Sequence, residues 1–206
     1  MTERIAPEPS SWTRMTQEDP GHSAAYVQRF RDLAARGMDL VGEARLVDAM
    51  LRRGSRVLDA GCGPGRVGGF LHEAGHEVVG VDVDPVLIAA AEDDHPGPRW
   101  LTSDLAALDL PSLGIPEPFD AIVSAGNVMT FLAPSTREAV LRRLRAHLRP
   151  DGRAAIGFGA GRGYDFDEFL ADASAAGWAP DLLLSTWDLR PFEPDSDFLV
   201  AVLRPV

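Results

Sequence analysis

Lysine is absent from the 206 residues, so that all twenty basic residues are arginines. An enzyme that holds pyridoxal phosphate needs a lysine for its Schiff base, and a phosphate-loop nucleoside triphosphatase needs one for its phosphates. Neither class fits this chain. Cysteine is nearly absent as well, because Cys62 is alone and has no partner for an internal disulfide. A reducing compartment is therefore expected.

Long apolar stretches are also missing. No run approaches the roughly 20 residues that a membrane-spanning helix needs, and the N-terminal segment has no apolar signal core. Acidic residues outnumber basic ones by 31 to 20, which makes the net charge −11. This charge disfavours binding to nucleic acid or to an anionic membrane. We expect a cytoplasmic protein with a small-molecule partner, acting as a monomer or homodimer.

Short buried runs alternate with amphipathic segments, which predicts an α/β fold. Strands are expected at residues 56–60, 77–81, 99–102, 119–124, 153–158, 182–188 and 198–203. Helices are expected at residues 23–35, 42–51, 67–74, 134–148 and 166–176, and another begins at Pro85. About nine residues join the last two strands, too few for a crossover helix, so they should form an antiparallel hairpin. We predict a doubly wound, Rossmann-like sheet of seven mostly parallel strands with helices on both faces.

The whole chain, residues 1–206, is expected to form a single domain. Residues 1–21 are rich in proline, serine, threonine and charge, and we expect a loosely ordered arm that drapes over the site. N-terminal helices at 22–53 precede a cofactor-binding core at 54–158. A final helix and the hairpin occupy 159–206.

The stretch from Val57 to Arg66, VLDAGCGPGR, is the most informative part of the chain. It has the pattern of a buried strand that ends in a glycine-rich turn and continues into a helix. Glycines at 61, 63 and 65 let the backbone turn sharply and let a ligand approach main-chain atoms. Asp59 lies where the strand ends, so the ligand should carry a cationic or hydroxyl group.

Other strand ends carry polar side chains too. Asp82 ends the second strand, Asp104 follows the third, and Ser124 ends the fourth, just before Asn127. Ligands of open α/β sheets bind at the carboxyl ends of the strands, so these residues predict one shared cofactor site. Each carboxylate taken alone fits a helix cap or an Asx turn equally well.

A nicotinamide dinucleotide is the alternative cofactor. Asp82 lies 21 residues beyond Gly61, where a carboxylate suits the ribose of either cofactor. The nucleotide fingerprint Gly-x-Gly-x-x-Gly fails when it is read from Gly61 but matches when it is read from Gly63 to Gly68. In that register Pro64 removes a backbone donor from the turn. The loop alone therefore separates the two cofactors only weakly.

Five motifs in the expected order, over roughly residues 55–158, resemble those of the class I S-adenosylmethionine-dependent methyltransferases. They are Asp59-x-Gly61-x-Gly63-x-Gly65, Asp82, Ser103-Asp104-Leu105, the strand from Phe119 to Ser124, and the turn from Leu148 to Arg153. The last resembles the family's L-[KR]-P-G-G turn, with Asp151 in place of the first glycine. These motifs and the closing hairpin favour this family over nicotinamide-binding proteins.

The resemblance implies S-adenosylmethionine as the cofactor. Its implied binding residues are Asp59, Gly61, Gly63, Gly65, Asp82, Val83, Asp104, Leu105 and Ser124. The glycines would hold the methionine part, with Asp59 near its ammonium group. Asp82 would hold the ribose, Val83 would pack on the adenine, and Asp104 with Leu105 would contact the adenine edge.

The acceptor side is less defined by the sequence. Transfer from a sulfonium needs mainly an in-line nucleophile and exclusion of water, and no catalytic residue stands out. The residues expected to face the substrate are His22, Tyr26, Asn127, Tyr164 and Trp187. Apolar residues after Asn127 suit an apolar acceptor, although core packing explains them as well. No metal site is expected, because Gly75 interrupts the His-Glu-x-x-His match at residues 72–76.

The predicted function is transfer of a methyl group from S-adenosylmethionine to a small-molecule acceptor, mainly through positioning. A non-catalytic S-adenosylmethionine-binding regulatory protein is one alternative, and an NAD-dependent oxidoreductase is another. A macromolecular acceptor is disfavoured by the acidic charge and by the lack of an added recognition domain.

Overall fold

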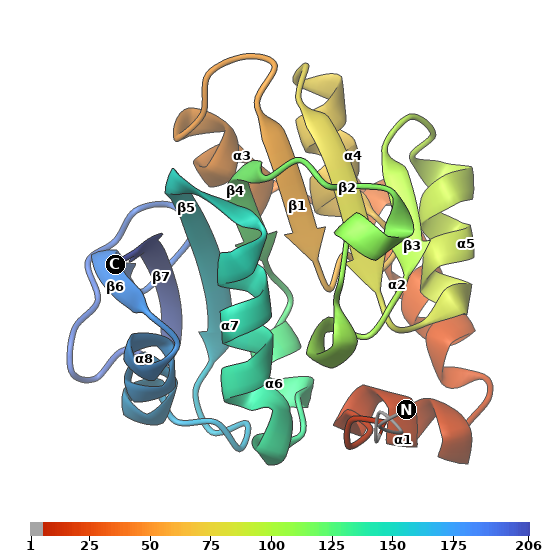
Figure 1. Ribbon diagram of the computed structural model, residues 1–206. Coiled ribbons are helices and arrows are strands. Elements are labelled where there is room, and N and C mark those ends of the chain that lie inside the picture. The colour runs from red at the N-terminus through yellow and green to blue at the C-terminus, as the bar shows by residue number, and fades with distance from the viewer. Residues whose placement is uncertain (1–5) are drawn as a thin grey trace.

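Seven strands form one sheet in the order β3-β2-β1-β4-β5-β7-β6 in the computed structural model, which describes residues 6–206 (Figure 1). The strands are β1 (Arg56–Ala60), β2 (Glu77–Asp82), β3 (Arg99–Thr102), β4 (Phe119–Ser124), β5 (Leu148–Gly159), β6 (Trp178–Leu184) and β7 (Phe198–Pro205). The pairings among β1 to β5 are parallel, whereas β7 runs antiparallel to both β5 and β6. The predicted fold class is confirmed.

Helices cover both faces of the sheet (Figure 1). They are α1 (Ser11–Glu18), α2 (His22–Ala35), α3 (Gly42–Ala49), α4 (Arg66–Glu73), α5 (Pro85–Asp94), α6 (Val128–Phe131), α7 (Arg137–Ala146) and α8 (Phe166–Ala175). Successive strand residues point to opposite faces, so that Leu58 joins the core under α7 and α8 while Val57 joins the core under α3 and α4. The sheet is thus buried on two sides, which explains its continuous apolar strands.

The expectation of a loosely ordered arm is wrong for residues 11–18, which form α1. Ser10 caps this helix, because its hydroxyl accepts the backbone N–H of Thr13 at 3.1 Å. Trp12 is buried, and its ring contacts Tyr26 with the centroids 5.2 Å apart. Trp12 and the partly buried Met15 pack this short helix against α2 and α5. Residues 1–5 of the expected arm lie outside the described residues.

Two boundaries near the C-terminus also differ from expectation. The strand predicted at 182–188 is β6, Trp178–Leu184, and it contains Pro180. Proline is tolerated there because β6 is the last strand of the sheet, where an N–H facing outward has no partner to lose. The turn predicted at 149–152 belongs to β5, where the register against β4 shifts between Phe119 and Ala121.

The parallel register brings the functional carboxylates to one edge of the sheet. Asp59 of β1 is paired with Val123 of β4, and Asp82 of β2 is paired with Thr102 of β3. Figure 1 shows α1 lying beneath this carboxyl edge. Within residues 6–206, the structure contains no helix with the length and apolarity that crossing a bilayer requires.

Candidate cofactor site

A cavity lies at the carboxyl edge of the sheet, between the glycine-rich turn after β1 and helix α1. Eight residues predicted from the sequence line it: Tyr26, Asp59, Gly61, Gly63, Asp82, Val83, Asp104 and Leu105. They come from α2 and from the ends of three different strands. The topology therefore gathers most of the predicted cofactor residues around one space, although their binding roles stay predictions.

Asp59 is the most buried carboxylate of this cavity, with 2% of its surface exposed. Its Oδ2 accepts the backbone N–H of Gly68 at 2.9 Å. Burial raises its pKa to about 7, and the Gly68 hydrogen bond offsets only part of this effect. Its Oδ1 has no hydrogen-bond donor among the described residues. A cationic group in the cavity would stabilise the ionised form, as an ammonium ligand requires.

Asp82 links the glycine-rich turn to the start of α5. Its Oδ2 accepts the N–H of Gly63 at 2.9 Å, and its Oδ1 accepts the N–H of Asp84 at 3.0 Å. Burial raises its pKa to about 6, against these hydrogen bonds. Each carboxylate oxygen retains a lone pair, so Asp82 is able to accept two further hydroxyl donors side by side.

The three glycines of the turn do not have the same role. Gly61 has φ +79°, and a Cβ there would lie 2.4 Å from Cγ2 of Val128, so only glycine fits. Gly65 does not line the cavity. A Cβ on it would lie 2.9 Å from Ala91 and 3.0 Å from the Trp100 ring. The third glycine therefore allows helix α4 to pack closely on α5 and β3, which corrects its predicted contact with the cofactor.

Asp104 fits both interpretations that the sequence left open. Its Oδ1 accepts the N–H of Ala106 at 2.8 Å and caps a short 3₁₀ helix, Leu105–Ala107. The same residue lines the cavity. Ser124 does not line it: its hydroxyl donates to the carbonyl of Ala60 at 2.8 Å and joins the ends of β4 and β1. This hydrogen bond makes Ser124 a support of the site floor, not a contact residue.

Tyr26 lines the cavity, unlike the other four residues predicted to face a substrate. Burial raises the pKa of its phenol, which therefore stays protonated. His22 packs edge-on against Trp12, with ring centroids 5.0 Å apart, and does not reach the cavity. Asn127 accepts the N–H of Gly159 through Oδ1 at 2.9 Å and ties the end of β5 to the segment after β4.

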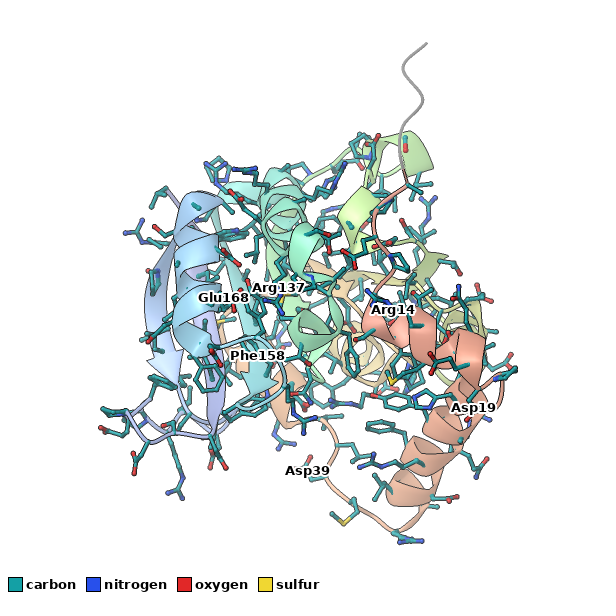
Figure 2. The ribbon with its side chains drawn as sticks, turned by 90° about the horizontal axis from the view of Figure 1, so that it is seen from below. Arg14, Asp19, Asp39, Arg137, Phe158 and Glu168 are labelled. Atoms are coloured by element: carbon teal, nitrogen blue, oxygen red, sulfur yellow. The ribbon has the colours of Figure 1, made fainter. Side chains whose placement is uncertain are left out.

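Tyr164 belongs to the core, which corrects its predicted exposure to substrate. It is 1% exposed, and its hydroxyl donates to Oδ2 of Asp172 at 2.6 Å. The guanidinium of Arg137 covers its ring at 3.8 Å, and Glu168 accepts Nη1 of this arginine at 2.8 Å. Figure 2 shows Arg137 and Glu168 side by side near Phe158. Aromatic packing between β5 and α8 therefore outweighs the position of Tyr164 after a strand end.

Trp187 lies on the face of the sheet that α3 covers. A Cβ on Gly157 of β5 would lie 2.4 Å from its ring. The ring belongs to a shallow apolar cleft with Leu46 and Leu184, away from the cofactor cavity. The predicted contact with a substrate is therefore corrected to a packing role.

Sequence reasoning expected residues 1–21 to lie over the site but did not identify α1. Trp12 of this helix and its N-cap Ser10 line the cavity. Trp12 donates through Nε1 to Oδ2 of Asp84 at 2.9 Å, and the Ser23 hydroxyl donates to the same oxygen. Asp84 also caps α5 by accepting the N–H of Val86 at 2.8 Å. One buried carboxylate thus joins α1, α2 and α5. The Ser10-Ser11 pair before Trp12 was the available signal for this helix.

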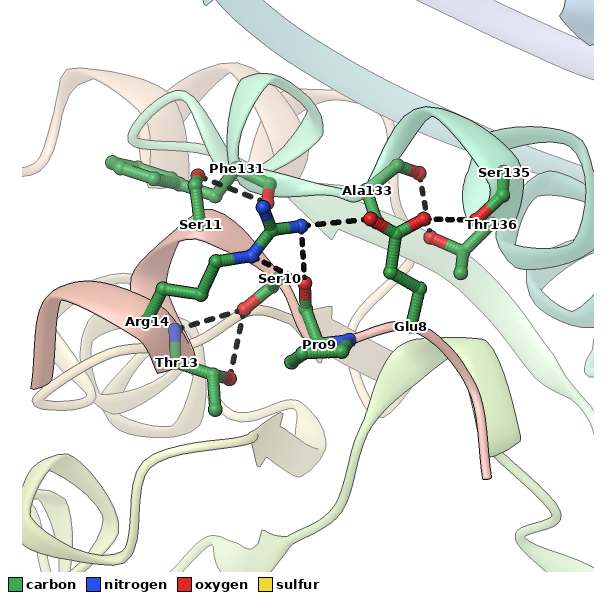
Figure 3. Close-up of polar contacts among 10 residues, drawn as sticks. All are labelled: Glu8, Pro9, Ser10, Ser11, Thr13, Arg14, Phe131, Ala133, Ser135 and Thr136. Atoms are coloured by element: carbon green, nitrogen blue, oxygen red, sulfur yellow. Dashed lines mark hydrogen bonds and ion pairs between the residues drawn. The ribbon is translucent and has the colours of Figure 1, made fainter. Parts of the chain in front are cut away.

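A second set of contacts fastens this segment to the far side of the cavity (Figure 3). Glu8 accepts the Ser135 hydroxyl at 2.6 Å and pairs with Arg14 at 2.9 Å. The Ser11 hydroxyl donates to the carbonyl of Phe131 at 3.1 Å. Residues 8–18 are therefore fixed beside the cavity by contacts to α6 and to the segment that follows it, with Ser10 and Trp12 as lining residues.

The fold is that of a Rossmann-like protein, and its cavity lies at the carboxyl edge of the sheet. The sequence profile of the family described as "Methyltransferase domain" matches residues 57–152. A crystal structure of a TehB-like SAM-dependent methyltransferase from Corynebacterium glutamicum is 51% identical in sequence, with a TM-score of 0.86. The match covers 91% of this chain and 100% of that chain. The chain belongs to the S-adenosylmethionine-dependent methyltransferases, and S-adenosylmethionine is its cofactor.

Two relatives of this chain are named for the acceptors that they methylate. A malonyl-[acyl-carrier protein] O-methyltransferase from Enterobacter lignolyticus is 31% identical over 136 residues, or 66% of this chain and 50% of the relative. A magnesium-protoporphyrin O-methyltransferase from Rhodobacter capsulatus is 32% identical over 132 residues, or 60% of this chain and 53% of the relative. The chain spans about half the length of these curated relatives.

Proposed function

We propose that this protein transfers the methyl group of S-adenosylmethionine to a small-molecule acceptor. The observation that carries the proposal is the cavity in which Asp59, Asp82 and Asp104 meet the glycine-rich turn. When bound, the cofactor supplies a sulfonium methyl group that is already a strong electrophile. The acidic side chains would hold its ammonium, its ribose hydroxyls and its adenine edge, in that order along the sheet.

The walls of the cavity support a reaction driven by positioning. Trp12, Phe131 and Leu132 form an apolar cover at the α1 and α6 side. An apolar cover excludes water from the reacting atoms, and a fixed geometry replaces much of the entropy cost of bringing two reactants together. No side chain that lines the cavity in the described part of the chain is a histidine or a lysine. The carboxylates of the cavity are assigned to the cofactor and the phenol of Tyr26 stays protonated, so the proposal assigns no catalytic base.

A small-molecule acceptor agrees with the cavity and with the magnesium-protoporphyrin relative. Ser10 and Trp12 line the cavity beside Phe131 of α6, which favours an acceptor small enough to enter it. The net charge of −11 disfavours nucleic acid. We further propose that the whole chain forms one domain that acts in the cytoplasm as a monomer or homodimer, with Cys62 reduced in the buried turn.

Isothermal titration calorimetry with S-adenosylhomocysteine and with NADH tests the cofactor assignment. We expect saturable binding of S-adenosylhomocysteine and none of NADH. Asp82→Ala should weaken S-adenosylhomocysteine binding, whereas Asp109→Ala, a change at an exposed position, should not. Transfer of a radiolabelled methyl group across a panel of small molecules then tests the activity. Tight cofactor binding without transfer to any acceptor would favour the regulatory alternative.

A further inference from the structure

Trp100 of β3 is a buried aromatic residue that packs against the glycine-rich turn without lining the cavity. It is 7% exposed, and its Nε1 donates to the carbonyl of His95, at the end of α5, at 3.0 Å. Its ring belongs to a small apolar cluster with Cys62 of the turn and with Ile88 and Ala91 of α5. The hydrogen bond and this cluster hold the indole in one orientation.

Three glycines make room for the six-membered ring of this indole. A Cβ on Gly80 of β2 would overlap Cε3 and Cζ3 of the ring, and a Cβ on Gly68 of α4 would lie 2.8 Å from Cη2. A Cβ on Gly65 of the turn would lie 3.0 Å from Cζ2 and from Cη2. A close-packed interior does not absorb such overlaps without a shift of ring or backbone. The ring therefore determines how closely α4 and the turn approach β2.

These contacts also account for the Gly-x-Gly-x-x-Gly match at residues 63–68. A dinucleotide-binding turn uses its third glycine for packing of the helix on the sheet and offers the helix N-terminus to a pyrophosphate. Here the third glycine is Gly68, which makes room for Trp100. Its N–H donates to Oδ2 of Asp59 at 2.9 Å, so a carboxylate already occupies this donor. The match therefore follows from packing on Trp100 and does not indicate a dinucleotide.

Gly68 connects the indole to the most buried carboxylate of the cavity. A Cβ on Gly68 would lie 3.1 Å from Cζ3 of Trp100 and 3.1 Å from Oδ2 of Asp59, so the backbone there packs between the two side chains. Hydrogen bonds weaken when their distance and direction change. A shift of α4 would misalign the bond from Gly68 and release the carboxylate of Asp59 from its orientation beside the cavity.

We propose that Trp100 is a positioning residue of the cofactor site, whose ring sets the spacing of β2, α4 and the glycine-rich turn and, through Gly68, orients Asp59. The inference rests on the proposed function, since Asp59 belongs to the same cavity. The side chain at position 100 then controls cofactor affinity without touching the cofactor. A leucine there leaves space into which α4 moves, whereas a methyl group added at Gly80 displaces the ring on which α4 packs.

Dissociation constants of S-adenosylhomocysteine, measured by calorimetry, test the proposal on the wild type, Trp100→Leu and Trp178→Leu. Trp178 is the matched control, because it is 2% exposed, donates through Nε1 to the carbonyl of Leu141 at 3.0 Å and belongs to the core under α7 and α8. Both variants lose a buried indole and its hydrogen bond, so both should be less stable in urea. We expect Trp100→Leu to weaken binding by about 10- to 100-fold, as when a hydrogen bond to a charged group is lost. Trp178→Leu should change the affinity by less than about twofold.

Gly80→Ala tests whether the effect passes through the ring. In the wild type the added methyl group meets the indole, so this change should weaken S-adenosylhomocysteine by about tenfold. In the Trp100→Leu background the indole is gone, and the same change should alter the affinity by less than about twofold. A role of Trp100 in stability alone does not produce this dependence of the affinity on the background.

Equal effects of Trp100→Leu and Trp178→Leu on affinity, or the same effect of Gly80→Ala in both backgrounds, would overturn the proposal. Where circular dichroism shows that Trp100→Leu does not fold, Trp100→Phe decides: it should weaken binding whereas Trp178→Phe should not. Where Gly80→Ala does not fold in the wild type, the comparison of the two tryptophan variants decides. Failure of the wild type to bind S-adenosylhomocysteine would instead refute the cofactor site itself, which separates the two hypotheses.

Discussion

Asp59→Asn should make the ligand-free protein more stable at alkaline pH while it weakens cofactor binding. Asparagine is nearly isosteric with aspartate, and its side-chain carbonyl is able to accept the Gly68 N–H in place of Oδ2. It removes the buried negative charge. A site built to hold an ammonium group is expected to be unfavourable for folding when that group is absent.

The magnitude follows from the pKa of Asp59, which burial raises from 3.8 to about 7. Between these values the folded protein holds a proton that the unfolded chain has released, so the free energy of unfolding falls as the pH rises. The fall is about 1.4 kcal/mol for each pH unit. From pH 5 to pH 8.5 the wild type should therefore lose about 3 kcal/mol relative to Asp59→Asn.

The assay is urea unfolding of the ligand-free wild type and of Asp59→Asn at pH 5 and at pH 8.5. Asp82 has its own pH dependence in both proteins, which cancels in the comparison apart from its coulombic interaction with Asp59. Asp109→Asn, a change at an exposed position, is the matched control and should follow the wild type at both pH values. A stability difference between wild type and Asp59→Asn that does not change with pH would refute the reasoning.

Two further predictions separate the cavity from the core. Trp12→Phe keeps an aromatic ring but loses the Nε1 donor to Asp84. Urea unfolding should therefore show that the free energy of unfolding falls by about 1–2 kcal/mol. Stopped-flow mixing should show faster release of S-adenosylhomocysteine. An unchanged release rate would mean that α1 does not close the site. Tyr164→Phe loses the hydroxyl contact to Asp172 and should cost about 1 kcal/mol of stability with cofactor affinity unaltered; a clear loss of affinity would contradict its placement in the core.

The sequence predicted the sheet because each parallel strand is a short apolar run whose period places alternate side chains on two buried faces. Val57 and Leu58 illustrate this, since they join different cores. The glycine-rich turn and the helix cap at Asp84 could also be predicted from the sequence, because positive φ angles and N-cap positions each favour a few residue types. The spacing of Asp59 and Asp82 fitted two cofactors. The resemblance carried by Asp104-Leu105, by the later strand and turn motifs and by the closing hairpin then favoured S-adenosylmethionine.

Contacts between distant segments were not readable from the sequence. Asp84 makes one contact of each kind. Its hydrogen bond to Val86 is a local helix cap that the sequence predicts, whereas its hydrogen bond to Trp12 spans 72 positions and has no sequence pattern. Glu8 and Ser135 are 127 positions apart, and neither has a pattern that identifies the other. For this reason α1, whose Trp12 lines the cavity, had been expected as a loose arm.

The sequence by itself determined the architecture, the edge of the sheet where the cavity lies and the carboxylates that line it, because local backbone preference and burial period specify them. The tertiary structure alone decided which side chains share the cavity. It placed Tyr164 in the core, and it raised the pKa of Asp59 by burial. These properties depend on the groups from several elements that surround a side chain. A local sequence pattern does not predict which groups these are.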